Sequence, residues 1–179
     1  MKKLTLLLSI FICSCCFAQK NITVTNLTSS AMKIYGIRTK PSVGTYPYCY
    51  GYAFALYPGQ SYTLVNNLST TKFPFYSSPT SLPPVVSGLN WTRVNSATNS
   101  LTNQTGTSLW NNAFAASQNF NYVDFSIGSI NGNPGNFGTI GVSTPGGVLT
   151  NPTGGWEAYY DFYQLSPTSS EVTITFIDL

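Results

Sequence analysis

The chain has 179 residues, of which 7% are charged, with 8 Lys and Arg, 5 Asp and Glu and no His. The lack of a basic cluster argues against a nucleic-acid partner, and the lack of His removes the commonest general base and metal ligand. We therefore expect no nucleic acid, metal or cofactor, and we favour a non-catalytic protein over an enzyme.

The first 18 residues have the layout of a secretory signal. Two lysines precede an apolar run from Leu4 to Cys13, and the small residue Ala18 follows. The run is too short to span a membrane. We expect residues 1–18 to be a signal peptide and residues 19–179 to be one domain, secreted to the extracellular space or the periplasm. Lipid attachment at Cys15 is the alternative, because the residues before it loosely resemble a lipobox.

Cleavage after residue 18 leaves Cys49 as the sole cysteine of the mature chain. No intramolecular disulfide can then form, so stability depends on apolar burial by about 160 residues, which is enough for one sizeable core. Because no basic residue adjoins Cys49 in the sequence, we expect a small buried side chain there and not a reactive thiol.

Short stretches of alternating apolar and polar residues recur along the chain, separated by Gly, Pro and Asn, and none has sustained helical periodicity. This pattern predicts an all-β, single-domain antiparallel β-sandwich with long Gly/Asn/Pro-rich loops. Residues 21–39 read as a hairpin, with apolar alternation on each side of the turn sequence NLTSS. Residues 55–67 turn at Pro58–Gly59 into a strand that carries Tyr62 and Leu64 on one side.

Between these stretches, every second residue from Tyr46 to Phe54 is aromatic and the residues between them are mostly small. A strand with this spacing has one wholly aromatic face, because alternate side chains point to opposite sides. That face is either part of the core or an exposed platform on which sugar rings stack. Tyr46 and Tyr48, nearest the preceding loop, are the members that we expect to be exposed.

The remaining candidate strands share the same alternation and are KFPFYS (72–77), LNWTRV (89–94), NYVDFSIG (121–128), FGTIGVS (137–143), GWEAYYDFYQL (155–165) and EVTITFIDL (171–179). The last two form a plausible closing hairpin, in which Val172, Ile174 and Phe176 face the core. A single helical turn is conceivable at residues 109–118. Long loops are expected at Ser77–Gly88 and Ser129–Gly155, the second enclosing the candidate strand 137–143.

The stretch from Trp156 to Tyr163 combines aromatic and acidic residues. Its core face would consist of Trp156, Ala158, Tyr160 and Phe162. Its other face carries Glu157, Tyr159, Asp161 and Tyr163, which suit hydrogen bonding and stacking with a polyol, although an ordinary solvated face has the same pattern.

A glycosidase needs two carboxyl groups about 5–9.5 Å apart. Glu157 and Asp161 are four residues apart on one strand, which separates them by roughly 13 Å. Asp124, from a different candidate strand, completes such a pair only if the two strands lie side by side.

Three segments resemble the thaumatin-like proteins. Residues 22–37 resemble that family's N-terminal strand, Asn-containing turn and second strand; residues 55–64 are similar to its Leu-x-x-Gly-Glu-Ser-Trp-Thr segment; and residues 120–135 are similar to its Tyr-x-Asp-x-Ser segment with the loop that follows. The resemblance implies a jelly-roll or thaumatin-like sandwich with an acidic cleft, and in some members binding or cleavage of β-glucans. Of the family's cleft acids only Asp124 has a matching position, and the family's disulfides are missing.

These patterns favour a secreted, non-catalytic module that recognises carbohydrate or another cell-surface polymer. The candidate binding residues are Tyr46, Tyr48, Asp124, Glu157, Tyr159, Asp161 and Tyr163. One alternative is a membrane-active, toxin-like sandwich whose exposed Tyr and Trp side chains insert at the headgroup level. Another is a polysaccharide hydrolase built on the same face.

Overall fold

The computed structural model describes residues 20–41, 43–66, 77–79, 86–104, 118–128, 136–166 and 169–179. The expected signal peptide, the expected lipid-attachment site at Cys15, most of the candidate strand 72–77 and nearly all of the helical turn predicted at 109–118 lie outside these residues. Within the described ranges, no helix has the length and apolar character needed to cross a membrane.

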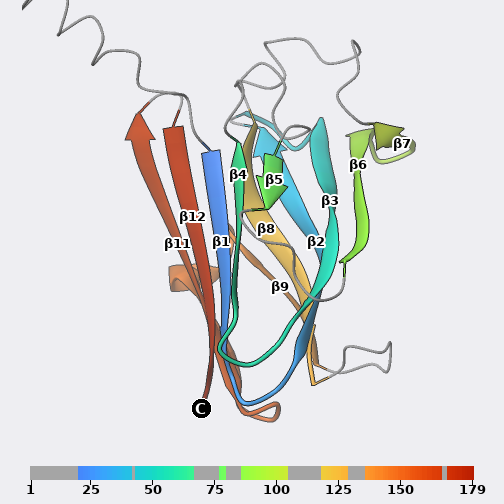
Figure 1. Ribbon diagram of the computed structural model, residues 1–179. Coiled ribbons are helices and arrows are strands. Elements are labelled where there is room, and N and C mark those ends of the chain that lie inside the picture. Colours follow the sequence, from blue (N-terminus) through green and yellow to red (C-terminus); the bar gives the residue numbers. More distant parts are fainter. Residues whose placement is uncertain are drawn as a thin grey trace, which may run out of the picture.

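Two six-stranded sheets form a sandwich (Figure 1), and this confirms the predicted all-β fold with its mostly antiparallel strands. Sheet A contains, in spatial order, β10 (Val148–Asn151), β11 (Trp156–Ser166), β12 (Ser169–Asp178), β1 (Lys20–Leu27), β4 (Ser61–Asn66) and β5 (Ser77–Pro79). Sheet B contains, in spatial order, β7 (Asn99–Gln104), β6 (Val86–Ser96), β3 (Tyr48–Leu56), β2 (Met32–Pro41), β8 (Gln118–Ile127) and β9 (Asn136–Gly141). The short 3-10 helix η2 (Pro145–Gly147) precedes β10.

The predicted hairpin over residues 21–39 is wrong, because β1 and β2 belong to different sheets. Strand β1 pairs in parallel with β12 and antiparallel with β4, whereas β2 pairs with β3 and β8. The alternating residues were nevertheless assigned to the correct side, since Ile22, Val24, Met32 and Ile34 are all fully buried. Alternation defines the inward face of each strand, but it cannot distinguish a strand beside its neighbour from a strand across the core.

The connection from β3 to β4 also crosses between the sheets, at the predicted Pro58–Gly59 turn. The β1–β2 and β3–β4 connections meet at the buried side chain of Asn26. Its Nδ2 donates to the carbonyls of Ser30 and Leu56 at 2.9 and 3.0 Å. The backbone of Asn26 also bonds that of Gly59 and Gln60. One buried amide therefore joins the two crossings, and Tyr62 and Leu64 enter the core as predicted.

The core forms where the inner faces of the sheets meet. As predicted, Val172, Ile174, Phe176 and Cys49 are fully buried. The ring of Phe125 on β8 contacts Phe176 on β12 edge-on, with 4.6 Å between the ring centroids. This contact joins the two sheets directly. Such packing is important here, because we expect no disulfide in the mature chain.

The predicted loop from Ser129 to Gly155 contains two strands: β9 confirms the candidate strand at residues 137–143, whereas β10 was not predicted, so the loop prediction is wrong for β10. The high glycine content of this segment is typical of a loop, but two of its glycines have a role in the sheet. A Cβ atom on Gly138 would lie 2.5 Å from the Phe125 ring, and one on Gly141 would lie 2.3 Å from the Tyr122 ring. Aromatic rings of β8 thus lie against the bare backbone of β9, which makes a Gly-rich segment part of the sheet.

We expect Phe176→Ala to lower the free energy of unfolding by about 3–5 kcal/mol, because it leaves a cavity between the sheets. The matched control is Thr175→Ala on the outer face of the same strand, for which we expect less than about 1 kcal/mol. Urea denaturation monitored by fluorescence measures both changes. Similar losses for the two variants would contradict the assignment of this strand's inner face.

Candidate functional site

The aromatic row from Tyr46 to Phe54 does not lie on a single face. Tyr46 and Tyr50 are 40% and 42% exposed, whereas Phe54 is 2% exposed and contacts Tyr62 in the core. The pairing of β3 with β6 shifts between Gly51 and Phe54, which marks β-bulges. The extra residues at these shifts lie on β6, and the strand pair is irregular at the point where the β3 side chains change sides. The first part of the row is therefore platform and its end is core.

Two further bulges lie in the neighbouring strands. In β2 the pairing shifts between Ile34 and Gly36, and in β8 it shifts opposite Arg38. Strict alternation from the start of each strand would bury Arg38, Tyr122 and Asp124. Because of the bulges, these three side chains point outward, and the sequence interpretation missed the first two.

The outward residues of β2 and β8, together with the loop before β3, surround a cleft of about 390 Å³. Its lining residues are Arg38, Thr39, Lys40, Gly44, Thr45, Tyr46, Tyr48, Tyr122 and Thr139. The rings of Tyr46 and Tyr48 are stacked, with centroids 5.7 Å apart and 26° between the ring planes. Among the described residues, two cations and three tyrosines thus line the cleft, and no acid does.

A second hollow, of about 320 Å³, shares Thr139 with the first. It is lined by Tyr35, Asp124, Phe125, Phe137, Gly138 and Thr139. The rings of Tyr35 and Phe137 are 5.3 Å apart, and the Lys33 ammonium lies 5.1 Å from the centre of the Tyr35 ring. We call the two hollows together the sheet B groove, which has aromatic rings in both of its parts.

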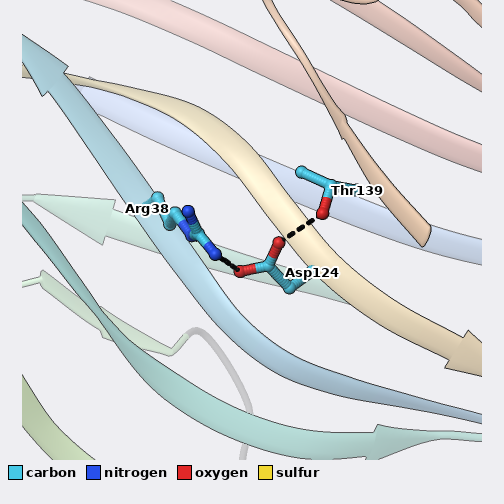
Figure 2. A network of polar contacts seen from close by, with 3 residues as sticks. All are labelled: Arg38, Asp124 and Thr139. Atoms are coloured by element: carbon cyan, nitrogen blue, oxygen red, sulfur yellow. Dashed lines mark hydrogen bonds and ion pairs between the residues drawn. The ribbon is translucent and has the colours of Figure 1, made fainter. Parts of the chain in front are cut away.

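Asp124 lies between the two hollows and is held from both sides (Figure 2). Its Oδ2 accepts from Arg38 Nε at 2.7 Å and lies 2.6 Å from Arg38 Nη2, while its Oδ1 accepts from Thr139 Oγ1 at 2.6 Å. Both carboxylate oxygens are therefore engaged. The predicted binding residue Asp124 orients the Arg38 guanidinium, which stays 41% exposed at the groove.

A buried polar network supports the tyrosine end of the groove. Gln118 Nε2 donates to the carbonyl of Pro47 at 2.9 Å, and Gln118 Oε1 accepts from Thr39 Oγ1 at 2.7 Å. Thr39 Oγ1 in turn accepts from the backbone N–H of Cys49 at 2.9 Å. The carbonyl between Tyr46 and Tyr48 is thereby tied to β8. Nothing in the sequence pattern indicated this role for Gln118.

Lys20, at the start of β1, is the charged member of this network. Its Nζ donates to the backbone carbonyl of Gln118, and the side chain is 2% exposed. Burial disfavours the charged form, and it lowers the pKa of the Lys20 amine from 10.5 to about 8. Burial likewise raises the pKa of the Cys49 thiol, which agrees with the expectation of an unreactive side chain.

The other predicted residues lie on sheet A, where Glu157, Tyr159, Asp161 and Tyr163 occupy the outer side of β11. Tyr159 Oη donates to Glu157 Oε2 at 2.6 Å and Thr150 Oγ1 donates to Glu157 Oε1 at 2.9 Å. These two bonds lower the pKa of the Glu157 carboxyl, and the bond to Glu157 raises the pKa of Tyr159.

Phe162 was expected in the core but is 37% exposed. Strand β10 pairs with β11 only as far as Tyr159, so the rest of β11 is a sheet edge. Every residue from Asp161 to Leu165 is exposed there. The core prediction is confirmed for Trp156, Ala158 and Tyr160. It is wrong for Phe162, which lies beyond the described pairing with β10, at the exposed edge of the sheet.

The predicted binding residues thus divide between two surfaces. Tyr46, Tyr48 and Asp124 belong to the sheet B groove, whereas the four residues of β11 lie on the outer side of sheet A. Asp124 on β8 does not lie alongside β11, so it forms no carboxyl pair with Glu157 or Asp161. Among the residues that the structure describes, no three Cys, Asp or Glu side chains gather in a way that could hold a metal ion.

Comparison with protein-family models, curated proteins and solved structures found no match. The thaumatin-like resemblance therefore stays a prediction. The geometry distinguishes the two surfaces. Both described pockets lie at sheet B, and each of them is lined by aromatic rings.

We expect stability to rise with pH because of Lys20. Between pH 8 and 10.5, the unfolded chain holds a proton on Lys20 that the folded protein has lost. The free energy of unfolding therefore increases through this window, and the penalty for burying the charge is fully present below it.

Urea denaturation of the protein and of Lys20→Met, from about pH 7 to about pH 9.5, measures the effect. The protein should gain about 2 kcal/mol relative to the variant over this range. Comparing the two curves cancels the titration of the tyrosines. Parallel curves would show that Lys20 has an ordinary pKa in the folded state.

Proposed function

We propose that this protein is a secreted, non-catalytic module that binds a polysaccharide in the sheet B groove. The observation that supports the proposal is the placement of aromatic rings in both hollows of one groove, with polar side chains between them. Sugar rings have apolar C–H faces that stack on aromatic rings, and their hydroxyl groups pair with polar side chains.

The presence of one aromatic pair in each hollow favours a polymer over a single sugar. Tyr46 and Tyr48 form a stacked pair in one hollow, and Tyr35 contacts Phe137 in the other. The Arg38–Asp124–Thr139 network lies between these pairs. A polymer offers several sugar units, so different units can stack on the two pairs at the same time.

Binding without turnover fits the acids of the groove better than hydrolysis does. Among the described residues Asp124 is the one acid that lines it, and both of its oxygens already accept hydrogen bonds. Glycoside hydrolysis ordinarily uses two carboxyl groups that face the same bond. The described groove offers a single one.

A membrane-active role is the second candidate, on a different surface. At the end of the β11–β12 hairpin, Phe162, Tyr163 and Leu165 are 37%, 55% and 66% exposed. Such side chains suit insertion at the level of the lipid headgroups. Flotation with vesicles of neutral and of anionic phospholipids tests this role, and Leu165→Asp should abolish co-flotation. Failure to float with either mixture would remove this candidate.

We expect Tyr46→Ala and Tyr48→Ala each to weaken polysaccharide binding by about three- to tenfold, because each removes a stacking ring. The matched controls are Tyr159→Ala and Tyr163→Ala, which remove the same side chain from the outer side of sheet A. A glycan array identifies a ligand, and calorimetry with that ligand then measures all four variants.

The pattern of losses decides between the two surfaces. If the β11 variants lose binding and the groove variants keep it, the ligand lies on sheet A and the proposed site is wrong. If the mature domain binds no glycan on the array, the proposed function is wrong.

A further inference from the structure

The outward charges of the sandwich are separated between its two sides. Lys33, Arg38 and Lys40 all lie on the outer side of β2, in sheet B. In sheet A, Glu157, Asp161 and Glu171 occupy the outer sides of β11 and β12. On the described outer side of sheet B, Asp124 is the single acid, and it is paired with Arg38. The side that carries the groove therefore has an excess of positive charge.

We infer that the ligand of the groove is an acidic polysaccharide, whose uronate carboxylates bind at Arg38 and Lys40. This inference rests on the proposed function and adds the class of sugar. Neutral sugars need only the rings and hydroxyls of the groove. The two cations lining its larger hollow favour a negatively charged ligand, because a neutral ligand leaves the Lys40 charge uncompensated.

Arg38 is arranged to bind a carboxylate in addition to Asp124. The guanidinium contacts Asp124 through Nε and Nη2, which lie along one edge. Its end away from Asp124 retains N–H groups, and a guanidinium binds planar carboxylates in a paired geometry. Because Asp124 fixes the orientation of Arg38, little side-chain freedom is lost when a ligand binds.

Lys40 supplies the uncompensated charge. It lines the cleft together with Arg38, and among the described residues it has no ion-pair partner. Tyr46 and Tyr48 line the same cleft. A uronate unit can therefore stack its ring on a tyrosine while its carboxylate pairs with Lys40 and Arg38. The ring and the carboxylate of one sugar would then each have a matching side chain.

A second pair of ring and cation lies beside the smaller hollow, which is lined by Tyr35 and Asp124 but not by Lys33 itself. Lys33 Nζ lies over the ring of Tyr35, next to Phe137. A second carboxylate of the same polymer would meet Lys33 there. A polymer with a carboxylate on many of its units fits this arrangement better than one with a single terminal acid.

The test compares polymers that differ only in their carboxylates. The probes are polygalacturonate and alginate, each beside its carboxyl-reduced form, with dextran sulfate as a polyanion without carboxylates. Affinity electrophoresis at about 50 mM and about 500 mM salt measures binding, since screening weakens the charged contacts more than the stacking. We expect a uronate polymer to bind at least about fivefold more tightly than its reduced form at the lower salt concentration.

The variant Lys40→Gln removes one cation and leaves the Arg38–Asp124 pair intact. We expect it to weaken uronate binding about fivefold and to leave any binding of the reduced polymers unchanged. Glu171→Gln, which removes one charge of the opposite sign from the outer side of sheet A, should have no effect. Thermal unfolding of each variant verifies that it is folded.

Three other outcomes would contradict the acidic ligand, and one of them would also contradict the proposed function. Equal binding of acidic and reduced polymers, reduced by Tyr46→Ala, would refute the acidic ligand and leave the proposed function standing. Equal binding of dextran sulfate and polygalacturonate, insensitive to Tyr46→Ala, would mean non-specific attraction to polyanions and would also refute the inference. Absence of binding to every polymer would count against both proposals.

Discussion

The structure depends on the burial of two apolar sheet faces against each other. With one cysteine in the described chain, no disulfide joins the described parts of the sheets, and aromatic side chains pack between them where Phe125 meets Phe176 and Trp156. Every strand in the centre of a sheet must therefore give one side to the core. The other side is free to vary, and polar, charged and aromatic residues that bind a ligand can gather only there.

The bulges decide which residues reach that free side. Without the bulge in β2, the alternation set by Met32 and Ile34 would direct Arg38 into the core, where a charge without a partner is costly. With it, Ile37 and Thr39 turn inward and Arg38 turns outward. The irregularity in β8 turns Tyr122 and Asp124 outward, and the one in the pairing of β3 with β6 separates the exposed Tyr50 from the buried Phe54. The outward positions of Arg38, Tyr122 and Asp124 thus depend on interruptions of the regular ladder in two adjacent strands.

The sequence predicted best where alternation is uninterrupted. In β1, β4 and β12 the apolar set was assigned correctly, as Val24, Leu64 and Ile174 show. Strand partners were not predictable, because pairing of β1 with β12 joins residues that are far apart along the chain. The side of residues beyond a bulge was not predictable, because one extra residue reverses the side of all that follow. Gly36 and Gly51 within strands were the available signal for two of the bulges.

The candidate site was predicted in part, and its charge was not predicted at all. Tyr46, Tyr48 and Asp124 were named from the sequence, but Arg38 and Lys40 lie in a stretch that reads as an ordinary polar strand face. The thaumatin-like resemblance covers the two inter-sheet crossings and β8, which are the segments that fix the framework. The net charge of the groove is set by the outward residues of β2, which are not part of the core. A sandwich of this kind can therefore carry a groove of either charge, and the choice of ligand follows from a few exposed side chains and not from the fold.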